Sequence, residues 1–306
     1  MSRPLALPAT AALVAALFVL PVSLPAQAPK TAADPLTAMA DAERAFARET
    51  AKVGIRAGFL AWFAHDAIGF QPTIGNAWDR LKARPVPPNP TAAQLDWEPR
   101  VGDVAASGEL GWLTGPSTFT APDGSKHYGN YLSVWTLGPE GWRVFIDVGA
   151  DAPTPVAFAP GFVRMPAAAG RYTAPASPAG AATGHPTAAL LQAESGANAD
   201  AARFLAAFAA EGRYHRPGSL PLVGHNAIAA DPAVTASGVR RSSLAAAQAR
   251  SADLGYTYGR YETRLAGSAA AGATAADPSG YYVRVWRRNG AGAWQIVAQV
   301  DQPDGQ

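Results

Sequence analysis

The stretch GELGWLTGPSTFTAPDGSKHYGNYLSVWTLGPEGWRVFIDVG, residues 108–149, decides the fold because most of it recurs near the C-terminus. The second version reads ADLGYTYGRYE from residue 252 and YYVRVWRRNGAGAWQIVAQVD from residue 281. In the alignment of the two, the matching segments are residues 109–112 with 253–256, 131–135 with 282–286, and 142–144 with 294–296. An internal repeat of this length predicts two similar folding units in the chain.

Helical patterns precede the repeated strands. A helix is predicted from Leu36, because a spacing of three and four residues puts apolar side chains on one face. The residues at this spacing are Leu36, Met39, Ala40, Glu43 and Phe46. A second helix is expected after Gly54, and its segment FLAWFA at residues 59–64 returns as FLAAFA at residues 204–209, with five identities in six positions.

Three long strands are expected to close the first unit, at residues 110–120, 128–137 and 142–148, with a weaker one at 100–106. The turn sequences PDG and GPEG between them predict antiparallel neighbours. Both faces of the middle strand are largely apolar. We therefore expect helices to cover one face of the sheet and a second domain or subunit to cover the other.

Length and composition agree with two domains. The chain has 306 residues, of which 48% are hydrophobic and 16% charged, so each unit has ample material for a core. The predicted domains are residues 36–150 and 187–303, and residues 151–186, rich in proline, alanine and glycine, are predicted to link them. Within the second domain, residues 266–278 are expected to form a long loop.

The N-terminus has the pattern of a signal peptide. Arg3 is followed by an apolar run and by the small-residue site Ala26-Gln27-Ala28, which predicts cleavage after Ala28 and a secreted or periplasmic protein. The alternative is a membrane anchor, but the apolar run is shorter than the roughly 20 residues that a bilayer span needs. No other segment resembles a span, and the absence of cysteine excludes disulfides and a lipid-attachment site.

The charge balance excludes a large class of partners. Removal of residues 1–28 takes away one arginine and no acid, which leaves 24 Lys+Arg against 23 Asp+Glu. A chain so close to neutrality has no field that would attract nucleic acid, and we expect no nucleic-acid partner.

Two helices, a broken strand-helix segment and a run of antiparallel strands resemble the nuclear-transport-factor-2-like superfamily, and more closely its SnoaL-like members. The motifs that carry the resemblance are Gly-Asp/Glu-Leu-Gly-aromatic, aromatic-x-x-Val-Trp and Gly-Trp-x-Val. It implies an α+β protein with two cone-shaped domains, in each of which N-terminal helices pack on a strongly bent antiparallel sheet. Such cones leave an apolar pocket at the open end, and they host ketosteroid isomerases, dehydratases, polyketide cyclases and binding modules.

Large aromatic side chains are the candidates for lining such a pocket. Strands with glycines at Gly111 and Gly115 can bend sharply, and rings on their concave face can surround a ligand. The candidate ligand-binding residues are Trp62, Trp97, Trp112, Tyr131 and Trp135. The alternative is that these rings simply fill the core of a small domain.

Three titratable residues of the first domain are candidates for catalysis. His65 and Asp66 are expected to close the second helix, near the pocket opening that the resemblance implies, and Asp147 is expected to share a strand face with Phe145. A carboxylate in a dry pocket gains a raised pKa and can serve as a general base, with the histidine as a proton carrier. The alternative is a histidine at a helix end followed by a turn aspartate.

The second domain does not repeat this set. Ala210, Glu211 and Gln299 stand at the positions of His65, Asp66 and Asp147 in the alignment, so chemistry is expected in the first domain only. No zinc, nucleotide-binding or nucleophile-elbow motif occurs, and we expect no metal and no cofactor.

Three hypotheses of function remain open. The first is a protein whose cones bind a small apolar molecule without catalysis. The second is an isomerase, dehydratase or cyclase with Asp66 as the base. The third is a structural or interaction module, in which the two domains form an intramolecular equivalent of a homodimer, with a homodimer of the whole chain as the alternative.

Overall fold

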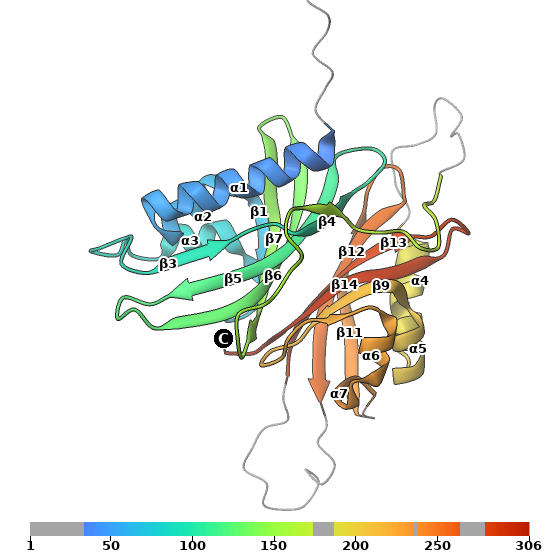
Figure 1. Cartoon of the computed structure of the whole chain (residues 1–306). Coiled ribbons are helices and arrows are strands. Elements are labelled where there is room, and N and C mark those ends of the chain that lie inside the picture. Colours follow the sequence, from blue (N-terminus) through green and yellow to red (C-terminus); the bar gives the residue numbers. More distant parts are fainter. Residues whose placement is uncertain (1–33, 174–186, 236–237, 264–278, 306) are drawn as a thin grey trace, which may run out of the picture. The chain divides into compact units, whose positions relative to one another are not determined.

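The computed structural model describes residues 34–173, 187–235, 238–263 and 279–305, and the predicted signal peptide and the predicted loop 266–278 lie outside them (Figure 1). Residues 34–152 are called the first copy and residues 187–305 the second copy. None of the described helices is long and apolar enough to cross a membrane.

Helices come first in each copy and long strands follow. The first copy contains α1 (Pro35–Val53), α2 (Ile55–Trp62), β1 (Phe63–Gly69), β2 (Gly75–Asn76), α3 (Ala77–Ala83), β3 (Gln94–Trp97), β4 (Val101–Val104), β5 (Leu110–Thr120), β6 (Lys126–Gly138) and β7 (Gly141–Ala152). The connection contains β8 (Val163–Arg164). The second copy contains α4 (Ala188–Ala197), α5 (Ala201–Ala206), β9 (Phe208–His215), β10 (Leu222–Val223), α6 (His225–Ala230), α7 (Pro232–Thr235), β11 (Val239–Gln248), β12 (Leu254–Thr263), β13 (Ser279–Arg288) and β14 (Trp294–Pro303).

The first helix begins and ends at residues suited to those places. The Asp34 carboxylate accepts a hydrogen bond from the Thr37 backbone N–H at 3.2 Å, which caps α1, and Pro35 takes the first position. The helix ends at Gly54, whose φ of 88° favours glycine. Gly58 of α2 lies so close to Thr50 that a Cβ there would approach the Thr50 hydroxyl to 2.2 Å, which lets α1 and α2 pack tightly.

The second helix is shorter than the sequence predicts. It ends at Trp62, and His65 and Asp66 lie on β1. The prediction that these two residues close a helix is therefore wrong. The reason is that Phe63 has extended backbone and begins a strand that pairs in parallel with β7, so sheet pairing takes over where the helical pattern of FLAWFA would have continued.

The two copies have the same strand order. The first sheet runs β2-β1-β7-β6-β5-β4-β8, with β3 also paired to β5, and the second runs β10-β9-β14-β13-β12-β11. In each sheet the long strands pair as antiparallel neighbours, and the strand after the helices pairs in parallel with the last strand. The sequence repeat is thus a repeat of structure, with separate sheets, as predicted.

A β-bulge stands at the same place in both copies. The register shifts between the pairs Val134↔Ile146 and Trp135↔Val144 in the first copy. In the second copy it shifts between Val285↔Ala298 and Trp286↔Ile296. The bulge places Phe145 against the second copy, 5.7 Å from the Tyr256 ring, while Asp147 lines a cavity inside the first copy. The prediction that Phe145 and Asp147 share a face is therefore wrong.

Each sheet buries both of its faces, as the apolar pattern predicts. One face packs on the copy's own helices, around Phe46 and Trp135 in the first copy and around Phe204 and Trp286 in the second. The other faces of the two sheets share one core, which joins Trp112, Leu132 and Ile146 to Tyr256, Val283 and Val300. The second copy is therefore what covers the outer face of the first sheet.

Equivalent residues of the two copies also meet in reciprocal polar contacts. The Ser107 and Ser251 hydroxyls lie 2.8 Å apart, and each accepts a hydrogen bond from the other's backbone N–H at 3.1 Å. Glu109 accepts from the Arg250 N–H at 2.7 Å, while Asp253 accepts from the Ala106 N–H at 3.0 Å. Contacts of residue i with j′ and of j with i′ are the mark of an isologous interface.

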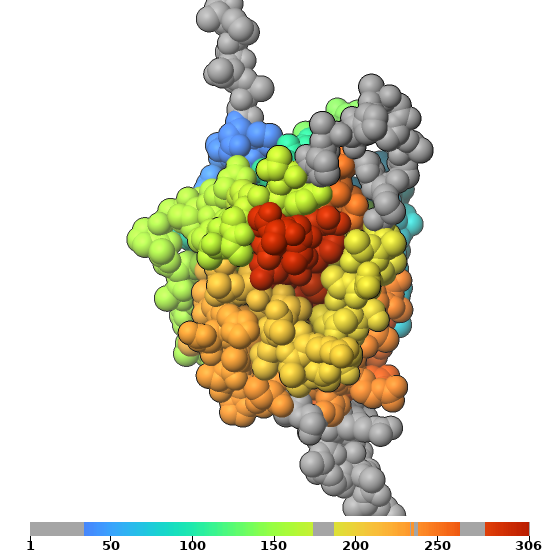
Figure 2. Space-filling model, turned by 90° about the vertical axis from the view of Figure 1, so that its right-hand side faces the viewer, coloured from blue at the N-terminus to red at the C-terminus, as the bar shows by residue number. Residues whose placement is uncertain are grey.

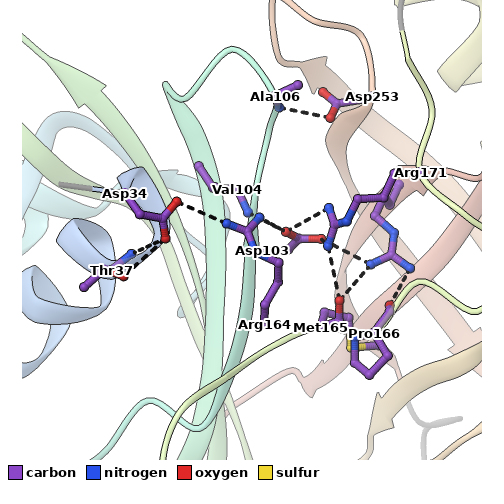
Figure 3. Close-up of polar contacts among 11 residues, drawn as sticks. Asp34, Thr37, Asp103, Val104, Ala106, Arg164, Met165, Pro166, Arg171 and Asp253 are labelled. Atoms are coloured by element: carbon purple, nitrogen blue, oxygen red, sulfur yellow. Dashed lines mark hydrogen bonds and ion pairs between the residues drawn. The ribbon is translucent and has the colours of Figure 1, made fainter. Parts of the chain in front are cut away.

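The connection between the copies is held by ion pairs around Asp103 of β4, which is fully buried (Figure 3). Its carboxylate binds Arg164 at 3.0 Å and Arg171 at 2.8 Å from the connection, and Arg287 of β13 at 3.2 Å. Arg287 also binds Glu211 at 2.5 Å. The carboxylate of Asp103 therefore fastens the connection and both copies together.

The described part of the connection does not stand free of the two sheets. Residues of this segment, yellow-green in Figure 2, lie directly beside the red C-terminal strands, and the Gly290 N–H donates to the Ala169 carbonyl at 2.9 Å. Phe162 packs on the inner core of the first copy and Phe158 on the shared core. Residues 174–186 of the predicted linker lie outside the described residues.

We expect the substitution Ala252→Gly to stabilise the protein by about 0.5–1 kcal/mol, because Ala252 has a φ of 54°, in the left-handed region that favours glycine. Gly108 occupies the equivalent turn with a φ of 80°, so Gly108→Ala should destabilise by about 1 kcal/mol. Urea unfolding of both variants measures these changes. If the two substitutions changed the free energy of unfolding in the same direction, the equivalence of the two turns would be contradicted.

We expect Asp103→Asn to lower the free energy of unfolding by about 3 kcal/mol, because it removes a buried carboxylate that pairs with the buried guanidinium group of Arg287 and with Arg164. Asp34→Asn is the matched control. Asp34 is an exposed partner of the same Arg164, and asparagine caps a helix as well as aspartate does, so a change below about 0.5 kcal/mol is expected. Denaturant unfolding compares the two, and similar losses would show that Asp103 is not the stronger anchor.

Candidate functional site

A cavity of about 230 Å³ opens inside the first copy between α2, β3, β5, β6 and β7. Its walls are mostly apolar, and Asp147 and Tyr131 are among the few lining residues that carry a polar group. The lining residues are Phe59, Leu95, Trp97, Ser117, Tyr131, Asp147, Val148, Gly149 and Gln302. An apolar hollow with a few polar groups is the usual form of a small-molecule site.

Asp147 enters this cavity from β7, directly after the bulge, opposite Ser133 of β6. Burial raises the pKa of its carboxyl well above the ordinary value, and the negative charge of Glu43 raises it further. A raised pKa means that the carboxyl keeps its proton at pH values where a free aspartate is ionised. In that form Asp147 can donate a hydrogen bond into the cavity.

Tyr131 of β6 brings a second donor to the same place. Its side chain is buried, and its hydroxyl has no hydrogen-bond partner within the described part of the chain. Burial raises the pKa of this phenol well above the ordinary value, and the charges of Glu43 and Asp147 add to the effect. The phenol therefore stays neutral and keeps its O–H as a hydrogen-bond donor.

Glu43 of α1 is a buried acid that binds Trp97 of the cavity wall and two residues of the adjoining core. Its carboxylate accepts hydrogen bonds from Trp97 Nε1 at 2.6 Å, Ser133 Oγ at 2.6 Å and Trp135 Nε1 at 2.8 Å. Burial raises its pKa, and these three hydrogen bonds reduce the rise without cancelling it. The contacts fix the Trp97 ring in the cavity wall. Sequence reasoning missed this role, although an acid on the apolar face of the first helix was a signal for it.

The second copy repeats the buried acid but closes the space around it. Glu194 of α4 accepts hydrogen bonds from Tyr282 at 2.6 Å and Thr257 at 2.7 Å, and from Arg284 at 2.9 Å. Arg284 is fully buried and stands at the position of Ser133 in the alignment. Burial raises the pKa of Glu194, but Arg284 and the neighbouring donors outweigh it and the net shift is downward. The second interior therefore holds a buried ion pair where the first has a cavity.

The candidate ligand-binding rings divide between the cavity and the cores. Trp97 and Tyr131 line the cavity. Trp62 and Trp135 pack around Phe46 in the inner core of the first copy, at ring distances of 6.1 and 6.4 Å. Trp112 is fully buried in the core that the two sheets share, because it lies on the outer face of β5.

The candidate catalytic residues are not brought together. His65 packs on the Trp78 ring at 4.5 Å and is exposed. Asp66 is also exposed, and it lies near enough to Tyr256 of the second copy for its charge to contribute to the raised pKa of that phenol. Asp147 is the member of the predicted set that lines the cavity. Among the described residues, no cluster of three or more His, Asp or Glu side chains is suited to hold a metal ion.

Comparison with known proteins yields similar structures only, since no protein-family model and no curated protein matches the chain. It is similar to an NTF-2 like protein of unknown function from Shewanella oneidensis, with 13% identity and a TM-score of 0.30 over 38% of this chain and 98% of the other. It is also similar to a ketosteroid isomerase-like protein from Erwinia carotovora atroseptica, with 17% identity and a TM-score of 0.29 over 39% and 90%. A third is a protein of unknown function with a cystatin-like fold from Nostoc punctiforme, with 15% identity and a TM-score of 0.29 over 39% and 90%.

The chain is an α+β protein in which one arrangement of helices and strands occurs twice. Its own topology carries this statement. In each copy helices precede a strand that pairs in parallel with the last strand of an antiparallel sheet, and both sheets have a bulge at the same register position.

We expect Asp147→Asn to change how stability depends on pH. The folded state keeps the Asp147 proton at pH values where the unfolded chain releases it, so this group lowers the free energy of unfolding as the pH rises above about 4. The asparagine variant lacks this loss, so its stability relative to the wild type should increase from pH 4 to pH 8. Urea unfolding at several pH values measures it, with Asp96→Asn as the control for an exposed carboxylate on β3. Parallel wild-type and Asp147→Asn curves would contradict the raised pKa.

Proposed function

We propose that the first copy binds a small, mainly apolar molecule that carries a hydrogen-bond acceptor such as a carbonyl oxygen. The observation that carries the proposal is the buried Tyr131 hydroxyl, which has no partner among the described residues and belongs to a side chain that lines the cavity together with Asp147. An unsatisfied buried hydroxyl costs about 1–3 kcal/mol. A ligand oxygen placed between the two donors would remove that cost.

The cavity supports a ligand of modest size. A volume of about 230 Å³ suits a body of about two fused six-membered rings. Phe59, Leu95 and Trp97 supply the apolar contacts, and hydrogen bonds from Tyr131 and from the protonated form of Asp147 would orient the ligand. Export through the predicted signal at residues 1–28 is part of the proposal and would place this binding outside the cytoplasm.

Binding is favoured over proton transfer by the placement of the acids. A base that removes a proton next to a carbonyl must be ionised and must reach the substrate. Asp66 lies near Tyr256 and does not line this cavity, and the raised pKa of Asp147 favours its protonated form. The arrangement therefore suits donation of hydrogen bonds to a guest better than abstraction of a proton from it.

The reciprocal contacts support a structural component of the same proposal. Two copies that meet through equivalent residues such as Ser107 and Ser251 would replace the two subunits of a homodimer. In this arrangement one chain supplies both the binding unit and the partner that covers its outer face.

We expect 2-acetylnaphthalene to bind the wild-type protein about five-fold more tightly than 2-ethylnaphthalene, since its carbonyl gains a net hydrogen bond of about 1 kcal/mol. The two probes have the same shape apart from the oxygen. In Tyr131→Phe the preference should fall toward one, while the free protein becomes as stable as the wild type or more so, because a buried hydroxyl is removed. Isothermal titration and urea unfolding measure the two effects.

The matched control is Tyr258→Phe, which removes a tyrosine hydroxyl from the region where the two sheets meet. It should retain the preference for the ketone. If the wild type binds neither probe, or if Tyr131→Phe prefers the ketone as strongly as the wild type does, the proposed function is wrong.

A further inference from the structure

The end of the second copy is fastened to the first copy. The Gln71 side-chain amide donates a hydrogen bond to the Pro303 carbonyl at 2.8 Å, and the Ile74 N–H donates to the Tyr281 hydroxyl at 3.2 Å. In Figure 1 the red end of the chain, marked C, reaches the region of β6. The last residue of β14 and the start of β13 are thus held to the segment between β1 and β2 of the first copy by specific contacts.

This end lies where the first sheet has an open edge. The parallel pairing of β1 with β7 extends to Ile68↔Ile146, and the chain leaves β7 after Gly69. The stretch of β7 from Asp147 to Gly149 therefore lacks a β1 partner on that side, and it is the stretch that lines the cavity. Gln302 of β14 lines the cavity together with it.

Gln302 borders more than this one cavity. A second hollow of about 400 Å³ shares Leu95, Ser117, Gly149 and Gln302 with the first, and its polar residues include His127 and Asn130. A third hollow of about 160 Å³ shares Phe59, Asp147 and Gln302 with the first and continues along Phe63, Phe70 and Leu81. The residue common to all three is Gln302, so it stands where the hollows meet.

The wall of the second hollow also carries polar groups. Ser117 of β5 and His127 of β6 line it, and the His127 side chain is exposed. A hydroxyl or an imidazole can pair with a hydroxyl or an amide N–H of a ligand. The space beyond the Asp147 cavity is therefore suited to a polar extension of the ligand.

The first copy does not reciprocate this contribution. Ala150 stands at the register position equivalent to Gln302, since Asn130↔Ala150 corresponds to Tyr281↔Gln302. Alanine offers no polar group, and the interior of the second copy is occupied by the buried Arg284 and Glu194 pair. The second copy therefore contributes Gln302 to the site of the first copy, and the first copy has no polar side chain at the equivalent position.

We propose that Gln302 is a specificity-determining residue of the site in the first copy, so that the second copy completes the binding site of the first. The ligand class is an elongated, mainly apolar ketone whose second polar group, a hydroxyl or an amide, lies beside the Gln302 amide. This inference rests on the proposed binding function and adds the second copy's part in it.

The test compares 2-acetylnaphthalene with 6-acetyl-2-naphthol, which carries an added hydroxyl at the far end of the ring system. The hydroxyl should increase affinity for the wild type about three- to five-fold, and Gln302→Leu should abolish that gain while leaving the affinity for 2-acetylnaphthalene within about two-fold. Gln302→Trp, which fills the junction, should weaken both probes at least ten-fold. Isothermal titration of the full chain measures all of these values.

The matched control is Gln295→Leu, a half-buried glutamine near the other end of the same strand that does not line the cavity or its two neighbours. It should bind both probes as the wild type does. If the wild type and Gln302→Leu show the same gain from the hydroxyl, or if Gln302→Trp binds as the wild type does, the role of Gln302 is refuted while the proposed function stands. Failure of the wild type to bind either probe refutes both.

Discussion

Burial of the outer faces of both sheets against each other is the constraint on which the rest of the structure depends. A sheet that is apolar on both sides needs a cover on each side, and a few helices can cover only one. The second copy supplies the other cover, through the core that joins Trp112 and Ile146 to Tyr256 and Val300. The polar contacts at Ser107 and Ser251 and the ion pairs of Asp103 fix the register of that packing, because buried polar groups must meet defined partners.

Although the two copies share one topology and pack against each other, the side chains in their interiors differ. Ser133 and Asp147 face each other across β6 and β7, and their equivalents Arg284 and Gln299 face each other across β13 and β14. In the second copy the Arg284 Nε donates to the Gln299 side-chain oxygen at 2.6 Å, and the guanidinium fills the interior. In the first copy the short serine leaves room, and burial raises the pKa of Asp147 opposite it. Different residues at a few positions on facing strands thus determine that the interior of the second copy is filled while that of the first copy contains a cavity.

Much of the fold could be predicted from the sequence, but the site could be predicted only in part. The repeat, the strands around Leu132 and the need for a cover on the outer face follow from periodicity and turn residues, which are local signals. The faces of Phe145 and Asp147 could not be predicted, because one bulged residue reverses the alternation that the period of two implies. The end of α2 was misplaced because sheet pairing with β7 overrides the helical pattern. Gln302 lay beyond sequence reasoning, since its place depends on how the copies pack.

The contrast between equivalent tyrosines gives the strongest reason to regard the first interior as functional. Tyr282 donates to Glu194 at 2.6 Å and so has the partner that a buried hydroxyl requires. Tyr131 occupies the same register position above the equivalent acid, Glu43, yet that acid accepts from Trp97, Ser133 and Trp135 instead. The same fold can therefore satisfy this hydroxyl, whereas in the first copy it has no partner among the described residues and lies near a carboxyl whose pKa is raised by burial. Departures of this kind from complete polar satisfaction are expected at binding sites, where a guest completes the set of partners.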